Sequence, residues 1–149
     1  LDVTIQAQIL SLMLGLKKEL GMSLLLITHD LGVVAQMASR VLVMYAGHIV
    51  EEAAVTDIFD QPFHPYTQGL LKSMPRRGDR ITGRRRRLNE IPGLVPSLTD
   101  VIEGCTFTDR CPQAFDICRK AYPQLAAIAA GQYARCWLME YPQRRHQHD

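Results

Sequence analysis

The stretch that decides the fold is Ser23-Leu24-Leu25-Leu26-Ile27-Thr28-His29-Asp30, a continuous apolar run that ends in polar residues. Short runs of this kind are typical of strands that are buried on both faces of a parallel sheet. A second apolar run, Val41–Tyr45, follows a helical segment at about residues 31–38. Strand, helix and strand with short connections predict a βαβ unit, and hence an α/β fold.

The residues before this unit predict a helix, and those after it predict a hairpin. Apolar residues recur at helical spacing over residues 3–20, Asp2 stands at the N-cap position, and Gly21 can supply a left-handed stop. The pair Ala46-Gly47 predicts a turn into an antiparallel strand at residues 48–51. Two short helices are expected after it, at about residues 54–60 and 65–73, and the second opens with a proline.

Composition excludes a membrane-spanning chain and favours a cytosolic one. The chain has 149 residues, 47% of them hydrophobic, with a formal net charge of +2. No apolar run reaches the roughly 18 residues that span a bilayer, and no signal peptide is recognisable. The chain opens on Leu1 directly in amphipathic sequence, which suggests that it begins in the middle of a longer protein.

Positive charge is concentrated in one segment. Seven arginines fall within residues 76–87, among them the run Arg84–Arg87. Such a run could bind nucleic acid electrostatically, or anionic lipid. No aromatic residues are interleaved to stack on bases, so no nucleic-acid partner is expected. Glycines and prolines interrupt residues 76–100, which we interpret as a linker.

The four cysteines follow residue 100, with the spacing Cys105-x5-Cys111-x6-Cys118-x17-Cys136. A cytosolic cysteine cluster more often binds metal or performs redox chemistry than forms structural disulfides. Zinc sites usually contain close Cys-x2-4-Cys pairs, and this spacing has none, whereas wide uneven loops suit an iron–sulfur cubane. An iron–sulfur cluster, zinc, and free or disulfide-bonded thiols all remain open. The neighbouring Arg110, Arg119 and Arg135 are expected to favour the thiolate form.

His29 follows the predicted strand at its carboxyl end, where α/β sheets bind ligands. An isolated histidine there would more simply satisfy a loop carbonyl. Four segments in order, however, resemble the second half of an ABC-transporter nucleotide-binding domain: Leu1-Asp2-Val3-Thr4-Ile5-Gln6, Ile27-Thr28-His29-Asp30-Leu31, Val41–Gly47 and His64-Pro65-Tyr66-Thr67. The resemblance implies the C-terminal part of a P-loop ABC ATPase domain.

Three further segments resemble the peptide-importer branch of that family. They are Gln61–Leu71 with its His-Pro-Tyr-Thr segment, Ile91-Pro92-Gly93-Leu94-Val95-Pro96, and Gly104-Cys105-Thr106-Phe107-Thr108-Asp109-Arg110-Cys111-Pro112. The match extends from residue 1 to about residue 138. It implies three parts: a nucleotide-binding part at 1–75, a linker at 76–100, and a cysteine-rich C-terminal region of the oligopeptide/dipeptide transporter type at 101–149.

The resemblance also assigns roles to single residues. His29 matches the switch histidine that contacts the γ-phosphate of ATP, and Asp2 matches the D-loop aspartate that reaches across a dimer. Asp2 can cap its helix at the same time. The four cysteines match positions that hold a 4Fe–4S cluster in several family members. The phosphate loop, the signature motif, the glutamine loop and the Walker B acids are absent from the 149 residues. We therefore expect ATP and Mg in the full-length ATPase only, and no activity from this stretch alone.

The implied function is to energise peptide uptake through an ABC importer. The implied partners are a second ATPase subunit, two membrane permease subunits and, indirectly, an extracytoplasmic peptide-binding protein. The implied location is peripheral, on the cytoplasmic face of the inner membrane. The solute, whether dipeptide, oligopeptide or nickel, and the choice between homodimer and heterodimer remain open. The alternative function is a stand-alone, non-catalytic metal- or Fe–S-binding interaction module.

Overall fold

The computed structural model describes residues 3–74, 90–97 and 99–145. The chain divides into two compact units, Leu1–Ser39 and Arg40–Asp149, and each is described by itself. Asp2, the run Arg84–Arg87 and most of the predicted linker lie outside the described residues. Within the described ranges, no helix is both long and apolar enough to cross a membrane.

The first unit begins with the predicted helix, α1 (Val3–Glu19). The helix ends as predicted: Gly21 has a φ of 61°, and the Met22 N–H donates to the Lys17 carbonyl, which closes the last turn in a Schellman-type cap. Its apolar face is not covered: Ile5 is 48% exposed and Leu12 is 63% exposed. Helical periodicity therefore predicted the element correctly, but no partner for its apolar stripe is described.

The strand predicted at residues 23–28 is not formed, and this prediction was wrong for the described chain. The segment is irregular, and Leu25 and Ile27 are 84% and 90% exposed. A strand exists only through a ladder of hydrogen bonds with a neighbour, and no described segment supplies one here. The βαβ unit is consequently absent as well, although its helix, α2 (Leu31–Met37), is present.

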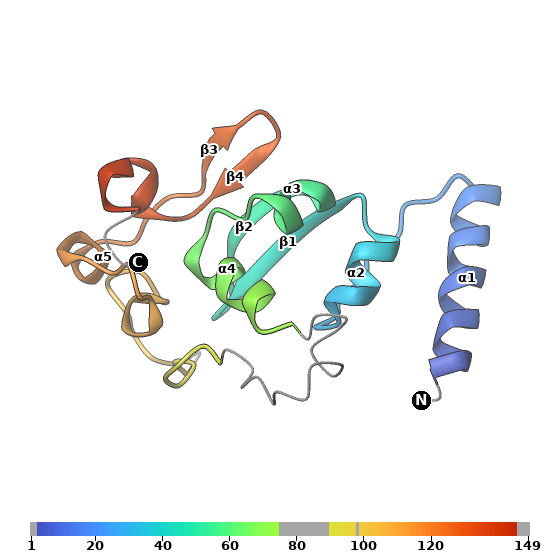
Figure 1. Ribbon diagram of the computed structural model, residues 1–149, viewed down its shortest axis with the longest axis horizontal. Helices are drawn as coiled ribbons and strands as arrows, with labels where there is room; N and C mark the ends of the chain where they lie inside the picture. The colour runs from blue at the N-terminus through green and yellow to red at the C-terminus, as the bar shows by residue number, and fades with distance from the viewer. Residues whose placement is uncertain (1–2, 75–89, 98, 146–149) are drawn as a thin grey trace, which may run out of the picture. The chain divides into compact units, whose positions relative to one another are not determined.

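The second unit contains a four-stranded antiparallel sheet with the order β1-β2-β4-β3 (Figure 1). Strands β1 (Arg40–Tyr45) and β2 (His48–Ala54) form the predicted hairpin, and Ala46 and Gly47 in its turn have φ values of 45° and 79°. Strands β3 (Ala126–Ala129) and β4 (Gln132–Ala134) form a second hairpin, and β4 pairs with β2. The C-terminal region thus completes the sheet that β1 and β2 begin.

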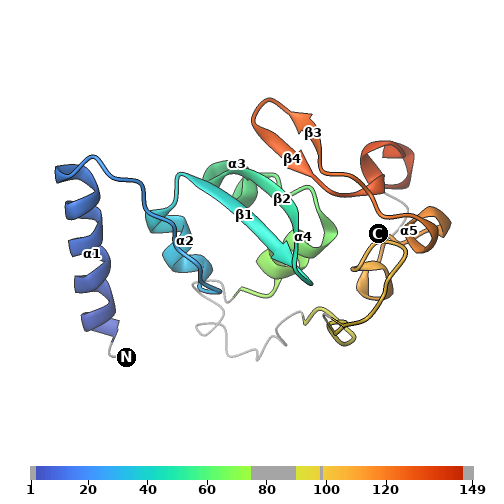
Figure 2. The same ribbon diagram turned by 180° about the vertical axis from the view of Figure 1, so that it is seen from behind.

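Two short helices follow β2, close to the predicted positions: α3 (Val55–Asp60) and α4 (Pro65–Lys72). Helix α3 contacts β1 and β2, and α4 lies beside the same hairpin in both views (Figures 1 and 2). The remaining elements are the 3-10 turns η1 (Thr108–Arg110), η2 (Trp137–Met139) and η3 (Pro142–Arg144), and helix α5 (Asp116–Lys120).

The core of this unit joins the sheet to the cysteine-bearing segments. Tyr45, Val50 and Phe107 are buried together, and Tyr66 of α4 packs against them. The rings of Tyr45 and Phe107 meet edge to face with centroids 5.2 Å apart, and those of Tyr45 and Tyr66 lie 4.7 Å apart. Aromatic pairs of this kind stabilise a core beyond the area they bury. The aromatic cluster therefore fixes η1 against the hairpin.

Candidate functional site

The structure brings all four cysteines to one cavity. Cys105 precedes η1, Cys111 follows it, Cys118 lies on α5, and Cys136 immediately precedes η2. Hydrogen bonds hold the first three together: the Cys105 N–H donates to the Cys118 carbonyl over 2.7 Å, and the Thr108 hydroxyl donates to the same oxygen over 2.9 Å. The Cys111 N–H in turn donates to the Thr108 carbonyl over 3.2 Å. The four cysteines, which are widely spaced in the sequence, therefore lie close together in the structure.

Gly104 allows this close approach. A Cβ atom built on Gly104 would overlap the Cys118 carbonyl oxygen and the backbone of Arg119. Backbone atoms cannot move aside as the end of a flexible side chain can, so the segment before Cys105 can lie against α5 only if it carries a glycine here.

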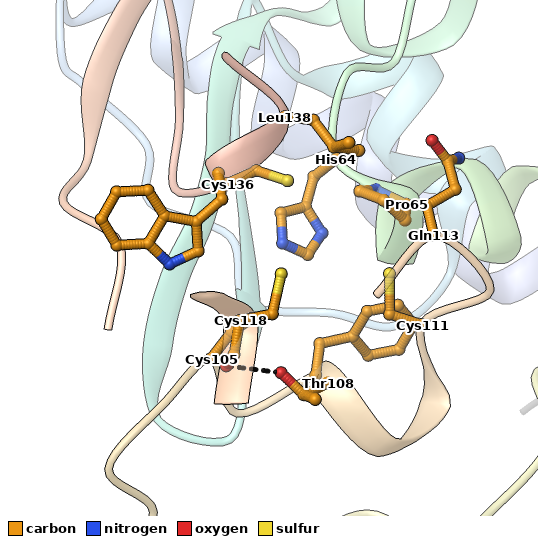
Figure 3. A pocket seen from close by; sticks show the side chains of 11 residues that line it. His64, Pro65, Cys105, Thr108, Cys111, Gln113, Cys118, Cys136 and Leu138 are labelled. Atoms are coloured by element: carbon orange, nitrogen blue, oxygen red, sulfur yellow. Dashed lines mark hydrogen bonds between the residues drawn. The ribbon is translucent and has the colours of Figure 1, made fainter. Parts of the chain in front are cut away.

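The cavity itself is small. Its volume is about 10 Å³, which is roughly the room for one water molecule. In Figure 3 the thiols of Cys111, Cys118 and Cys136 point toward the imidazole of His64, which forms another part of the wall. All four thiols are free of disulfides. Within the described ranges, no group of three or more His, Cys, Asp or Glu side chains is arranged to hold a single metal ion.

Burial makes these thiols weak acids. It raises the pKa of Cys105 and raises the pKa of Cys111 and Cys136 to about 12, and the neighbouring thiols add to the shift. The cause is desolvation, which disfavours the charged thiolate. These three thiols are therefore protonated at neutral pH in the metal-free protein, and only a ligand that stabilises thiolates would deprotonate them.

The expectation that Arg110, Arg119 and Arg135 favour the thiolate form was wrong. Arg110 donates to the carbonyls of Ile91 and Pro92, Arg119 pairs with Asp109, and Arg135 donates to the carbonyls of Ile49 and Pro123. The long side chains of these arginines are engaged elsewhere, and the pKa values of Cys105, Cys111 and Cys136 move up rather than down. These arginines therefore bind backbone carbonyls and a carboxylate of other segments, and they do not stabilise cysteine thiolates.

His64 is the buried centre of the His-Pro-Tyr-Thr segment. It is 1% exposed and is the N-cap of α4, where its Nδ1 accepts from the Tyr66 N–H over 3.1 Å. Burial lowers the pKa of His64 to about 4, against an opposing backbone hydrogen bond with Arg135. The imidazole is therefore neutral at pH 7, and its Nδ1 is already occupied by a helix amide.

A buried carboxylate holds the backbone of this segment. Glu51 of β2 is 2% exposed, and its two oxygens accept from the N–H groups of Phe63 over 2.6 Å and His64 over 2.9 Å. Sequence reasoning missed the roles of Glu51 and His64. For His64 a signal existed, because Pro65 at the first helical position makes the preceding residue the cap. For Glu51 no local signal existed, since its partners lie twelve and thirteen residues away.

His29 lies in the first unit and is exposed. Its backbone is held on both sides. The Asp30 N–H donates to the Thr28 hydroxyl over 3.0 Å, and the Asp30 carboxylate caps α2 by accepting from Gly32 and Val33. Within the described residues, the His29 side chain makes no hydrogen bond, ion pair or ring contact. Asp2, its predicted companion, falls outside the described residues.

Comparison with known proteins shows what the chain is similar to. Residues 50–118 match the family model described as "Oligopeptide/dipeptide transporter, C-terminal region". The chain is 56% identical over 137 residues to "Probable peptide ABC transporter ATP-binding protein y4tR" of Sinorhizobium fredii. The aligned region covers 92% of this chain and 40% of that protein.

Two further relatives agree. "Oligopeptide transport ATP-binding protein AppD" of Bacillus subtilis is 50% identical over 94% of this chain and 42% of its own length. "Dipeptide transport ATP-binding protein DppD" of Escherichia coli is 46% identical over 91% of this chain and 40% of its own length. The chain thus spans about two fifths of the length of these relatives. Over nearly its whole length the chain is similar to peptide ABC transporter ATP-binding proteins, and residues 50–118 match the oligopeptide/dipeptide transporter C-terminal region.

Proposed function

We propose that this chain is part of an ATP-binding and ATP-hydrolysing subunit that energises the uptake of di- or oligopeptides through an ABC importer. The observation that carries the proposal is the similarity over nearly the whole chain to proteins named as peptide transport ATP-binding proteins. The buried His64 and the Glu51 carboxylate that holds it give the characteristic His-Pro-Tyr-Thr segment a defined structural role, which supports the same assignment.

In this proposal His29 contacts the γ-phosphate of ATP, and Asp2 reaches the second ATPase subunit across the dimer. The His29 imidazole is exposed, and the side chains of Thr28 and Asp30 on either side of it hold the backbone of the turn. The imidazole is therefore suited to contact a ligand that comes from outside the described residues. Mg accompanies the ATP. Two such ATPase subunits act on two membrane permease subunits at the cytoplasmic face of the membrane, and an extracytoplasmic binding protein delivers the peptide.

Uptake of labelled peptides tests this function. Deleting the gene in the source cell is expected to abolish import of a labelled dipeptide or tripeptide, and a plasmid copy of the complete gene should restore it. Labelled nickel ion serves as the second substrate in the same cells. Unchanged peptide import would contradict the proposal, and loss of nickel import alone would assign a different solute to the same machinery.

A second proposal concerns the cysteines, which we assign to a 4Fe–4S cluster. Four thiols line one cavity, yet they are not arranged for a single ion. This donor set fits a cubane, in which each thiolate binds a different iron, better than it fits tetrahedral zinc. Because the cavity has room for only about one water molecule, the cysteine-bearing loops must separate to admit the cluster. When bound, the cluster would crosslink η1, α5 and η2.

Anaerobic reconstitution with iron and sulfide tests this second proposal. The wild-type protein is expected to gain broad visible absorption and to bind about four iron atoms per chain, whereas Cys111→Ser should bind markedly less. Reconstitution with zinc alone is the comparison. One tightly bound zinc per chain without iron uptake would favour the zinc site, and four thiols that titrate freely after both treatments would exclude either metal.

A further inference from the structure

A polar groove lies beside the cysteine cavity in the second unit. Its volume is about 520 Å³, within the range of small-molecule sites. Side chains from five segments line it: Gln61 before α4, Gln68 and Lys72 on α4, Gln113 before α5, Gln132 on β4, and Arg145 after η3. Gln113 and Leu138 also line the cysteine cavity, so the two hollows share a wall.

The charge of the groove is one-sided. Among the described residues that line it, Lys72 and Arg145 are the charged ones and none is an aspartate or glutamate. The buried Glu51 carboxylate acts electrostatically on Arg145, but its two oxygens are engaged by the N–H groups of Phe63 and His64. Among the described residues that line the groove, an anionic group therefore meets two cations.

The guanidinium of Arg145 packs against the ring of Phe63. This guanidinium lies 3.5 Å from the centroid of the Phe63 ring, which also lines the groove, and the residue is partly buried. In the described part of the chain, no hydrogen bond or ion pair of this guanidinium is present. Desolvation by partial burial lowers the pKa of Arg145, and the Glu51 carboxylate acts in the opposite direction. The planar fork of donors of Arg145 is thus available to a carboxylate.

The glutamines that line the groove indicate which chemical groups the rest of the ligand carries. Each carboxamide offers both donors and an acceptor, which complements the N–H and C=O groups of a peptide bond. Gln68 is already oriented, because its Nε2 donates to the carbonyls of Pro62 and Phe63 and leaves its Oε1 to accept. A site for phosphate would instead be built mainly from cations and converging backbone amides.

We propose that this groove binds a short peptide through its free C-terminal carboxylate, which pairs with Arg145 while the glutamines bind the peptide amides. Its lining residues include neither His29 nor any of the cysteines, and the proposed binding does not depend on ATP hydrolysis.

Calorimetric titration of the complete protein with trialanine tests the site. Saturable binding is expected, and C-terminally amidated trialanine should bind at least about tenfold more weakly because it lacks the carboxylate. Arg145→Gln is expected to weaken the binding of trialanine by about the same factor. Arg144→Gln is the matched control, since Arg144 lies one residue earlier, over the ring of Phe115, and does not line the groove. It should leave the affinity unchanged.

Three outcomes would overturn the proposal: no saturable binding, equal affinity for trialanine and its amide, or equal losses in the Arg145 and Arg144 variants. Binding of inorganic phosphate in place of trialanine would do the same, because it would show a general anion site. Should Arg145→Gln fail to fold, Lys72→Gln provides the second measurement, with a several-fold loss expected. ATP hydrolysis by the same samples reports on the ATPase function independently.

Discussion

Replacing His29 by alanine is expected to lower the rate of ATP hydrolysis by the complete protein about 10²–10³-fold, the loss typical of removing one positioned donor from a developing charge. ATP binding should fall far less, because most of the binding energy for the nucleotide comes from other contacts. The measurement is the steady-state rate of phosphate release, together with the dissociation constant of ATP, for wild type and variant.

The structure makes this variant informative because the side chain of His29 supports nothing around it. The turn is held by Thr28 and Asp30, whose hydrogen bonds to the backbone survive the substitution. His48→Ala is the matched control: His48 is also exposed, and its ring lies 5.0 Å from that of Tyr122, in the second unit. Equal rates for wild type and His29→Ala would remove the proposed role, whereas a loss in both variants would indicate a general effect on folding.

Local signals predicted the elements that depend on local interactions. Helix α1 follows from helical periodicity and ends at Gly21 because a left-handed residue closes its last turn. The β1–β2 hairpin follows from Ala46-Gly47, which adopts the two positive φ values of a tight turn. Helix α4 starts at Pro65, whose fixed φ suits the first helical position. In each case the decisive contacts lie within a few residues.

Predictions that needed a distant partner failed. Residues 23–28 have the composition of a buried strand, but strand formation requires hydrogen bonds from another segment, and the described residues supply none. The β3–β4 hairpin was missed for a related reason. Its first strand is mostly alanine, which has low strand propensity, and the pairing of β4 with β2 fixes it in place. The turn glycine Gly131, with a φ of 73°, was the one local signal available.

In the candidate site, too, the sequence predicted some features, whereas those that depend on distant contacts were missed. Spacing alone singled out the four cysteines, and the structure brings them to one cavity. Spacing could not give the direction of the arginine side chains, because neighbours along a turn or strand point to different sides. Nor could it show that the cavity shares its wall with the His-Pro-Tyr-Thr segment, since His64 lies forty or more residues before the cysteines.

That shared wall makes Glu51 the residue on which the arrangement depends most. Its carboxylate holds the N–H groups of Phe63 and His64, His64 caps α4 and lines the cysteine cavity, and Phe63 lies under Arg145. Glu51→Ala is expected to lower the free energy of unfolding of this unit by about 2–5 kcal/mol, because it leaves two backbone N–H groups without an acceptor, one of them fully buried. Glu51→Gln should cost less, about 1–3 kcal/mol, because one N–H keeps an oxygen partner.

Urea denaturation measures the two losses, and hydrogen exchange at the amides of Phe63 and His64 locates them. Glu52→Ala is the matched control: Glu52, the next residue in β2, is buried like Glu51 and pairs with Arg40, whose side chain is 64% exposed. Because Arg40 stays solvated when its partner is removed, Glu52→Ala is expected to cost less than Glu51→Ala. Faster exchange at Phe63 and His64 only in the Glu51 variants would confirm that one carboxylate holds the segment. Equal losses for Glu51→Ala and Glu52→Ala would show instead that the strand tolerates neither change, and that the hydrogen bonds of Glu51 have no special weight.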